Sequence, residues 1–323
     1  MTKDKKNNKT TKSNLNPPTV IKVIGVGGSG SNAISRMMQC HLKGVELIVI
    51  NTDSQDLEKS RAHRKLRIGR ELTRGLGSGM DPEIGRQAAE EQKTEIIEMT
   101  KGADMIFIAY GLGGGTGTGA GPVVAELAKQ SGALTMAVVT MPFSFEGQAR
   151  RAVAEEGLKK LEKSVDALVA IENDRLMEVL DMKTTVDNAF WYCDEILRET
   201  VSGISNLIIL PGPIDINFAD IKSIMTNAGL ALFGVGRGSG ERRAEKAAQN
   251  AITSPLLNLS IKGAKRVLFN VIGGKDISLA EIDEVAKVIT KEISKDAKII
   301  FGAVEDEKIK KGEIRVTVIA ADF

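Results

Sequence analysis

The sequence predicts an α/β fold in which a first domain with a parallel sheet is followed by a long central helix and a second, α+β domain. Three glycine-rich loops, over residues 25–30, 69–80 and 111–119, each precede the start of a predicted helix, as loops in parallel α/β sheets do. From Arg242 onward such loops are sparse and the order becomes strand, helix, strand, strand. That change indicates a separate second domain.

The first predicted strand, residues 19–25, leads into Gly25-Val26-Gly27-Gly28-Ser29-Gly30, and a helix then opens at Ser31. This matches the G-x-G-x-x-G fingerprint of Rossmann-like domains in the strand, loop and helix setting that it requires. A second strand over residues 45–50 ends near Asp53, where a dinucleotide-binding protein uses an acidic residue on the ribose. This part of the chain alone therefore permits an NAD-dependent oxidoreductase.

Strands and helices continue to alternate through the first domain. Apolar segments of strand length predict strands over residues 103–110, 133–140 and 166–171. Helix-start signals, such as Asp81 before Pro82, predict helices over residues 81–100, 121–129 and 148–163. We assign residues 20–183 to this domain and expect the polar, lysine-rich tail over residues 1–19 to be disordered.

The central helix is predicted over residues 184–205, and the second domain over residues 206–323. At the start of the second domain, a turn over residues 211–220 opens a helix that reaches about Leu230. Further helices are predicted over residues 242–251 and 278–291, and strands over residues 264–272, 298–303 and 313–321.

Composition excludes several classes of function. The net charge is +2, but the tail holds five lysines against one aspartate, so the remaining residues carry a charge of −2 and give no reason to expect a nucleic-acid partner. The two cysteines have no metal-binding spacing, and with only two histidines a His-based zinc site or a Ser-His-Asp triad is nearly excluded. No apolar run reaches membrane-spanning length, so we expect a cytoplasmic protein without a transmembrane segment.

The glycine run over residues 111–119 lies between a predicted strand and a helix, a geometry that turns backbone N–H groups toward an anion. Thr116 and Thr118 add hydroxyl donors. Three loops of this kind indicate a longer phosphate chain than one pyrophosphate. No Walker A lysine is present, because Lys275 in Gly273-Gly274-Lys275 is followed by Asp276. N–H groups, helix dipoles and a metal ion would therefore balance the phosphate charge.

Two residue pairs have both a functional and a structural interpretation. Phe190 and Asp194 are four apart and share a helix face. The ring suits stacking on guanine, and the carboxylate suits the N1–H and N2–H₂ donors that adenine lacks as a pair. A half-buried phenylalanine beside a solvated aspartate fits the spacing equally well. Glu146 and Arg150 are also four apart and form at least a local ion pair.

Several segments resemble one known family. Gly113-Gly114-Gly115-Thr116-Gly117-Thr118-Gly119 resembles the glycine signature of the tubulin/FtsZ family, and other segments resemble family motifs in the same order: residues 25–32, 51–53, 75–83, 145–147, 173–175, 218–220 and 254–257. The resemblance covers nearly all of residues 20–323 and implies a GTPase that binds GTP or GDP with Mg²⁺. It also implies head-to-tail protofilaments, a cytoplasmic division ring and membrane-tethering division proteins as partners.

Carried over by position, the resemblance implies roles for individual residues. The phosphates would lie against Gly27, Gly28, Ser29, Asn32, Gly77, Gly114, Gly115, Thr116 and Gly117. Glu146 and Arg150 would reach the ribose and phosphate side, and Asn173, Phe190 and Asp194 would hold guanine. Mg²⁺ would bridge the terminal phosphates without a protein ligand. An oxidoreductase, in contrast, leaves the run over residues 111–119 without a role.

The resemblance further implies that residues 211–220 enter the nucleotide site of the next subunit, where an acidic group orients water for attack on the γ-phosphate. The family usually has two aspartates there, three residues apart, whereas this chain has Asn217 and Asp220 as its catalytic candidates. An amide cannot accept a proton from water. We therefore expect a slow, assembly-dependent GTPase, or alternatively a filament-forming relative with little hydrolysis; Asp215 is a candidate for partial compensation.

Overall fold

The computed structural model of the protein describes residues 19–40, 42, 44–178, 184–209, 212–254, 260–306 and 309–323. The expected tail lies outside the described residues except for Thr19, as do residues 210–211 and residues 255–257 of the motif over residues 254–257. Within the described ranges, no helix combines the length and the apolar character needed to cross a membrane.

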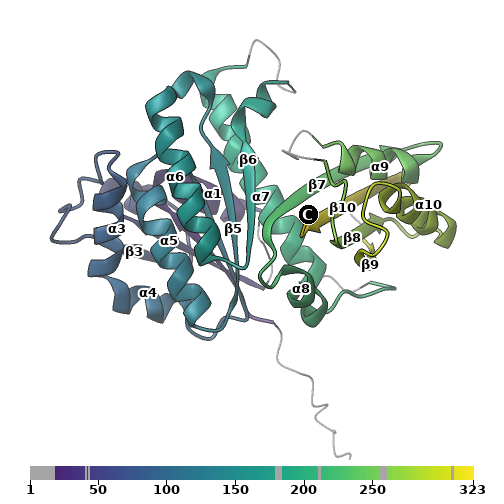
Figure 1. Cartoon of the computed structure of the whole chain (residues 1–323), viewed down its shortest axis with the longest axis horizontal. Helices are drawn as coiled ribbons and strands as arrows, with labels where there is room; N and C mark the ends of the chain where they lie inside the picture. Colours follow the sequence, from purple (N-terminus) through teal and green to yellow (C-terminus); the bar gives the residue numbers. More distant parts are fainter. Residues whose placement is uncertain are drawn as a thin grey trace, which may run out of the picture.

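Six parallel strands form the first sheet, in the order β3-β2-β1-β4-β5-β6. Figure 1 labels β3, β5 and β6 of this sheet. Their bounds are β1 Ile21–Val26, β2 Val45–Asn51, β3 Arg64–Arg67, β4 Met105–Gly111, β5 Leu134–Met141 and β6 Ala167–Glu172. β1 and β5 are buried along their whole length, which is why most of their residues are apolar. The one charged residue in them, Lys22 of β1, donates its ammonium group to the Met99 and Lys101 carbonyl groups. Strand order reverses between β1 and β4, and ligands of open α/β sheets bind at such a switch point.

Helices cover both faces of this sheet. α1 (Gly27–Gln39) and α7 (Val186–Ile209) share the apolar core on one face. The other face is covered by α3 Pro82–Glu91, α4 Lys93–Thr100, α5 Gly115–Gln130 and α6 Gln148–Ser164. A short helix, α2 (Ser54–Lys59), follows β2. This arrangement makes the first part of the chain a doubly wound, Rossmann-like domain, as the sequence predicts.

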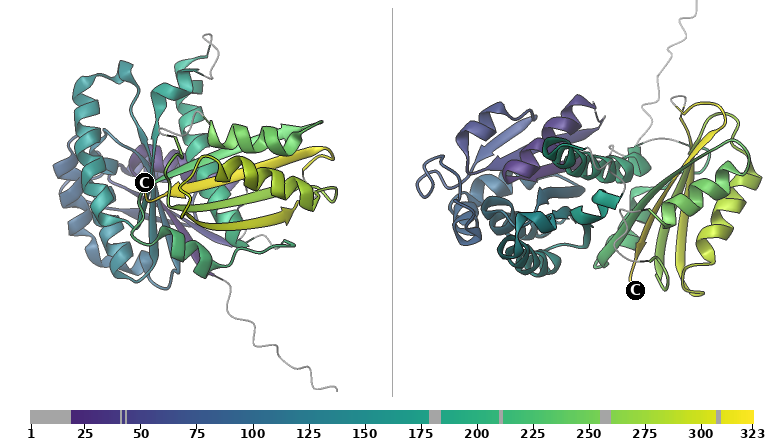
Figure 2. Two further views of the ribbon diagram at one scale, coloured as in Figure 1. Left: turned by 45° about the vertical axis from the view of Figure 1, so that its right-hand side comes forward. Right: turned by 90° about the horizontal axis from the view of Figure 1, so that it is seen from above.

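The second sheet lies on the other side of α7 (Figure 2). Its strands are β7 Gly229–Ser239, β8 Arg266–Gly273, β9 Lys298–Glu305 and β10 Glu313–Ala321, in the order β7-β10-β8-β9. β10 runs antiparallel to both neighbours, and β8 pairs with β9 in parallel. α9 (Arg243–Ile252) and α10 (Leu279–Thr290) cover the outer face, while α8 (Phe218–Met225) precedes β7. β7 touches β6 through two residue pairs, which join the sheets.

The prediction of a helix reaching Leu230 is wrong, because α8 ends at Met225 and β7 begins at Gly229. Glycine at alternate positions weakens the strand pattern of this segment, and packing explains those glycines. A Cβ on Gly236 or Gly238 would collide with backbone carbonyl groups of α9. These glycines lower the local strand propensity, but they allow α9 to pack closely on the sheet.

Further elements differ from the sequence prediction. α1 begins at Gly27 rather than at Ser31, and α7 continues to Ile209 rather than ending at residue 205. α5 begins at Gly115 rather than at residue 121, so that much of the glycine run is helical and Pro122 lies inside the helix. The helix predicted over residues 81–100 is divided at Gln92 into α3 and α4. β3 and α2 were not predicted, since both are short and polar.

Candidate functional site

Two helix N-termini meet at the switch point of the first sheet. α1 follows β1 directly and α5 follows β4, and the position of a Cβ on Gly27 would lie 3.0 Å from the Gly117 nitrogen. Neither helix has a side-chain cap, whereas α2 and α3 are capped by Asp53 and Asp81. The uncapped N–H groups and the aligned dipoles of α1 and α5 make this corner suitable for an anion.

The glycine run serves two purposes. Gly113 has a φ of +90° and lies against Arg150, whereas a Cβ on Gly114 would have no neighbouring atom within 4 Å, so Gly114 borders open space. Gly115 and Gly119 instead face α3, where a Cβ would collide with Ser78 and with the Pro82 carbonyl. Only the first part of the run thus borders the anion corner, and the second part allows α3 to pack closely on α5.

Because the two parts of the glycine run have different roles, we expect different results from an alanine substitution in each part. Gly119→Ala is expected to lower the free energy of unfolding by about 1–3 kcal/mol through overpacking, measured by chemical denaturation. Gly114→Ala is expected to fold normally and to weaken nucleotide binding, measured with a fluorescent GTP analogue, because its methyl group would occupy the space beside the helix N-terminus. Equal losses of stability in both variants would contradict the division.

The hydroxyl groups of the run are engaged within the protein. Thr116 Oγ1 is 2.7 Å from Thr52 Oγ1 and 3.0 Å from Ser78 Oγ, and Thr118 Oγ1 accepts the Gly113 N–H at 2.9 Å. The sequence suggests both hydroxyls as phosphate donors, and in the structure both also stabilise the loop. The Thr118 hydroxyl accepts in this contact and keeps its own hydrogen to donate, so its role toward a phosphate stays a prediction. Thr116 can still contribute its backbone N–H in the first turn of α5.

A cavity of about 210 Å³ extends from this corner toward α7. It brings together seven of the predicted nucleotide-binding residues, Ser29, Asn32, Glu146, Arg150, Asn173, Phe190 and Asp194. They come from α1, α6, α7 and two short 3₁₀ helices, η1 (Ser144–Glu146) and η2 (Asn173–Glu178). Gly77 is not among the lining residues; its φ is +84°, and its nearest neighbour is Asp53.

Two side chains in the cavity have polar atoms without a protein partner. Arg150 Nη1 lies 3.1 Å from Glu146 Oε2, and Glu146 Oε1 accepts the Phe143 N–H at 2.8 Å. The Arg150 Nε and the Asn173 Oδ1 are buried but have no hydrogen bond to any residue that the structure describes. Because buried polar groups are rarely left unsatisfied, one orphaned donor and one orphaned acceptor in the same cavity indicate a polar ligand.

Asp194 lies deep in the cavity beside a cation that the sequence analysis missed. Its Oδ2 is 3.3 Å from Arg36 Nε on α1, and the Arg36 guanidinium lies 5.1 Å from the centre of the Trp191 ring. Burial raises the pKa of Asp194 to about 6, although Arg36 opposes the shift. No local pattern in the sequence connects residues so far apart, so this contact could be found only in the structure.

Aromatic rings border the cavity at the start of α7. Phe190 meets Phe143 edge to face at 5.6 Å and Phe145 at 6.4 Å between ring centres. Phe190 is 40% exposed and Phe145 60% exposed, so both rings retain free surface for stacking on a planar group. The sequence analysis singled out Phe190 but not Phe145, which immediately precedes Glu146.

The candidate catalytic residues are not near this cavity. Asn217 Oδ1 accepts the Asp220 N–H at 2.9 Å, and Asp220 Oδ2 accepts the Asn217 N–H at 3.1 Å, which forms a capping box on α8. Asp194 lies near the start of α7, whereas α8 follows its end at Ile209, about 22 Å farther along the helix axis. Within one chain, Asp220 therefore cannot reach a ligand held by Asp194.

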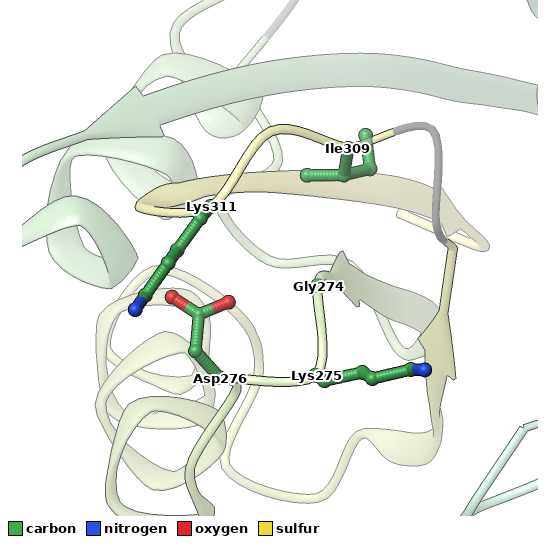
Figure 3. A pocket seen from close by; sticks show the side chains of 5 residues that line it. All are labelled: Gly274, Lys275, Asp276, Ile309 and Lys311. Atoms are coloured by element: carbon green, nitrogen blue, oxygen red, sulfur yellow. The ribbon is translucent and has the colours of Figure 1, made fainter.

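Two motifs from the sequence have structural roles only. The Asp53 carboxylate accepts the N–H groups of Gln55 and Asp56, so it caps α2 and does not face a ribose. Gly274 and Lys275 border a separate cavity of about 540 Å³ in the second domain, where the Lys275 side chain points away from Asp276 (Figure 3). Asp276 accepts a hydrogen bond from Arg243 at 2.7 Å. This segment is no phosphate loop.

Comparison with known proteins gives two family matches. Residues 20–181, just over half of the chain, match the Tubulin/FtsZ family, GTPase domain. Residues 229–323 match the FtsZ family, C-terminal domain. The matches agree in order with the motifs that the sequence shares with the family.

Solved structures give the same result. An FtsZ dimer from M. jannaschii is 42% identical, with a TM-score of 0.89, and the match covers 95% of this chain and 89% of that one. A variant of FtsZ from the same organism is 43% identical, with a TM-score of 0.89 and coverage of 94% and 91%. CetZ2 from Haloferax volcanii, in a GTPγS-bound protofilament, is 20% identical with a TM-score of 0.79, covers 94% and 93%, and shows the fold alone.

The resemblance noted in the sequence is thus confirmed by family models over both domains and by solved structures over nearly the whole chain. The doubly wound first domain, the long α7 and the second sheet also agree with the predicted fold class. The chain belongs to the tubulin/FtsZ family, and it joins the GTPase domain of that family to the C-terminal domain of FtsZ.

Proposed function

We propose that the protein binds and hydrolyses GTP and assembles head to tail into cytoplasmic filaments that form a division ring. The observation that carries this proposal is the cavity, which combines seven predicted nucleotide contacts with two unsatisfied buried polar groups. Self-association is supported by relatives described as an FtsZ dimer and a CetZ2 protofilament. Attachment of the ring to the membrane would require a separate tethering protein.

Guanine fits the end of the cavity formed by α7. An ionised Asp194 accepts the N1–H and N2–H₂ groups of guanine, and adenine offers no equivalent pair of donors. The exposed surfaces of Phe190 and Phe145 are available for contact with the base. Glu146 and the unpartnered Nε of Arg150 lie at the adjoining end, where hydroxyl and phosphate oxygens of the nucleotide would satisfy them.

The phosphates fit the corner where α1 and α5 begin. Backbone N–H groups of Gly28, Gly115 and Thr116 belong to the uncapped first turns, and Gly114 borders open space. Mg²⁺ prefers phosphate oxygens and waters as ligands, and when bound it would balance charge on the terminal phosphates. The chain itself supplies the N–H donors and the helix dipoles.

Hydrolysis would be completed between two subunits. The length of α7 separates the cavity from α8, so that head-to-tail stacking is the arrangement that brings one subunit's Asp220 to the nucleotide of the next. Asp220 uses Oδ2 to cap α8, and its second carboxylate oxygen can orient a water for in-line attack. Turnover would therefore depend on assembly.

Asn217→Asp is expected to increase GTP turnover, because a second carboxylate beside Asp220 would add negative charge near the attacking water. An aspartate also caps α8 as well as an asparagine does, so stability should not change. Phosphate release and light scattering, recorded together with GTP, measure turnover and assembly. Scattering without release in the wild type favours a filament former with little hydrolysis, and no gain in the variant would contradict a limiting role for Asn217.

A further inference from the structure

A second cavity lies between α7 and the inner face of the second sheet. Its volume is about 250 Å³, and it shares no lining residue with the candidate nucleotide site. α7 contributes Arg198, Glu199, Ser202, Gly203 and Asn206, and the sheet contributes Val235, Arg237, Ile272, Arg315 and Thr317. Gly236 and Gly238 face α9 on the outer side of the sheet, so the alternating Arg237 projects toward α7.

Two arginines of the sheet stand directly opposite each other. Arg315 on β10 pairs in register with Arg237 on β7, and like charges in this relation destabilise a sheet. Among the described residues, Arg315 has no hydrogen bond and no ion pair, and its Nε is buried. Burial and the neighbouring Arg237 lower the pKa of Arg315, although the charges of Glu199 and Asp306 oppose the shift.

The carboxylates of α7 are already engaged by other arginines. Glu195 forms a bidentate pair with Arg198, with N···O distances of 2.8 and 2.5 Å. Glu199 Oε1 is shared, at 3.7 Å from Arg198 and 3.5 Å from Arg237. Three guanidinium groups thus face two carboxylates of α7. Asp306 is a further carboxylate whose charge acts on Arg315, but among the described residues it forms no ion pair with Arg315.

A buried hydroxyl group points to the same conclusion independently. Ser202 is only 6% exposed and lines this cavity, and its Oγ has no hydrogen-bond partner within the described part of the chain. An unsatisfied hydroxyl beside an unpaired guanidinium matches the donors that an oxyanion needs. Arg237 is 68% exposed at its side chain, so it retains the freedom to close over a ligand.

We propose that this cleft binds phosphate, either as the free ion or as the phosphoryl group of a small molecule. The Arg315 and Arg237 guanidinium groups would each offer a planar fork of donors, and Ser202 would donate its hydroxyl. A phosphate group carries close to two negative charges at neutral pH and would therefore neutralise both facing arginines. The volume of about 250 Å³ admits a phosphate or a short phosphomonoester, and the site is independent of the nucleotide pocket.

Thermal unfolding in inorganic phosphate, against sodium chloride at matched ionic strength, tests the proposal. All samples contain excess GDP, so that phosphate does not report on the candidate nucleotide pocket. Saturating phosphate is expected to raise the unfolding temperature by about 2–5 °C. Arg315→Met, which keeps the aliphatic stem, should remove this response and should unfold no earlier than wild type in chloride, because it removes a like-charge contact.

Arg61→Met is the matched control, since Arg61 is exposed and distant from the cleft, and it should keep the full response. Glycerol 3-phosphate in place of phosphate shows whether the site accepts a phosphomonoester or only the free ion. The proposal is overturned if wild type responds equally to phosphate and chloride. It is also overturned if Arg315→Met retains the phosphate response, which would place the anion elsewhere.

Discussion

Asp220→Asn is expected to reduce GTP turnover by about 10²-fold or more, with GTP binding and filament assembly retained. The substitution removes the negative charge that would orient the attacking water but preserves the geometry of α8. An asparagine oxygen can still accept the Asn217 N–H, as the Asp220 carboxylate does at 3.1 Å. Phosphate release under assembling conditions measures the loss, and sedimentation measures the filaments.

The matched control for Asp220→Asn is Asp283→Asn, which removes an exposed carboxylate from α10 in the same domain. It should not alter turnover, since Asp283 pairs only with Lys287 on the surface. Wild-type turnover in Asp220→Asn would remove this carboxylate from the mechanism. A loss of assembly together with turnover would instead assign Asp220 to the contact between subunits.

Asp194→Asn is expected to weaken GTP binding by about 100-fold, because it loses charge-assisted hydrogen bonds to two guanine donors. Its amide group also places a donor against the base. Titration with fluorescent GTP and ATP analogues measures both affinities. The affinity for ATP, which we expect to be low in the wild type, should change little. An equal loss of affinity for both nucleotides would contradict base recognition by Asp194.

The same carboxyl group predicts a pH dependence. Guanine donors favour the ionised form of Asp194, whose pKa in the free protein is about 6. GTP affinity should therefore be constant above about pH 7 and fall roughly tenfold per pH unit below about pH 6, a dependence that Asp194→Asn should lack. Affinity that does not change between pH 7 and pH 5 would contradict this assignment.

The free energy of unfolding of the nucleotide-free protein should decrease as pH rises, whereas the affinity for GTP increases. The folded-state pKa of Asp194 lies above its ordinary value, so the native state holds a proton that the unfolded chain has lost, and this contribution to stability disappears as pH rises through about 4 to 6. At neutral pH, burial of the ionised Asp194 carboxylate lowers the free energy of unfolding. Asp194→Asn is thus expected to be no less stable than wild type, so that weaker binding cannot be attributed to unfolding.

The sequence predicted those parts of the fold that depend on local signals. The strands before Gly27 and Gly114 are mostly apolar runs of strand length, and the spacing of Phe190 and Asp194 alone predicts that they share one helix face. The family resemblance predicts all seven residues that meet in the cavity, and the spacing in the sequence also singles out Glu146, Arg150, Phe190 and Asp194. The spacing alone did not decide between guanine binding and a structural role.

The parts that the sequence did not predict depend on contacts between distant segments. Arg36 reaches Asp194 from another helix, and Arg237 meets Arg315 across two strands. The sequence does not predict β7, because its glycines lower the strand propensity and are explained only by the close packing of α9. The sequence also predicts a phosphate loop over all of residues 111–119, whereas the last glycine of this run allows α3 to pack closely. In each of these cases, the residue contacts a segment far away in the sequence, and that contact is visible only in the folded structure.

Mixing two impaired variants tests most directly whether each site is completed by the next subunit. Asp220→Asn retains an intact nucleotide cavity, and Asp194→Asn retains an intact loop on α8. At a GTP concentration that saturates the wild-type cavity but not the cavity of Asp194→Asn, neither variant alone should turn over GTP at the wild-type rate. In mixed filaments, the cavity of the first variant would meet Asp220 of the second. Random mixing in equal amounts should restore up to about a quarter of the wild-type sites.

Phosphate release from the mixture is therefore predicted to exceed the sum of the two separate variants severalfold, and to increase with total protein concentration as filaments form. A mixture that releases no more phosphate than that sum, although sedimentation shows that both variants enter the same filaments, would contradict completion of the site between subunits.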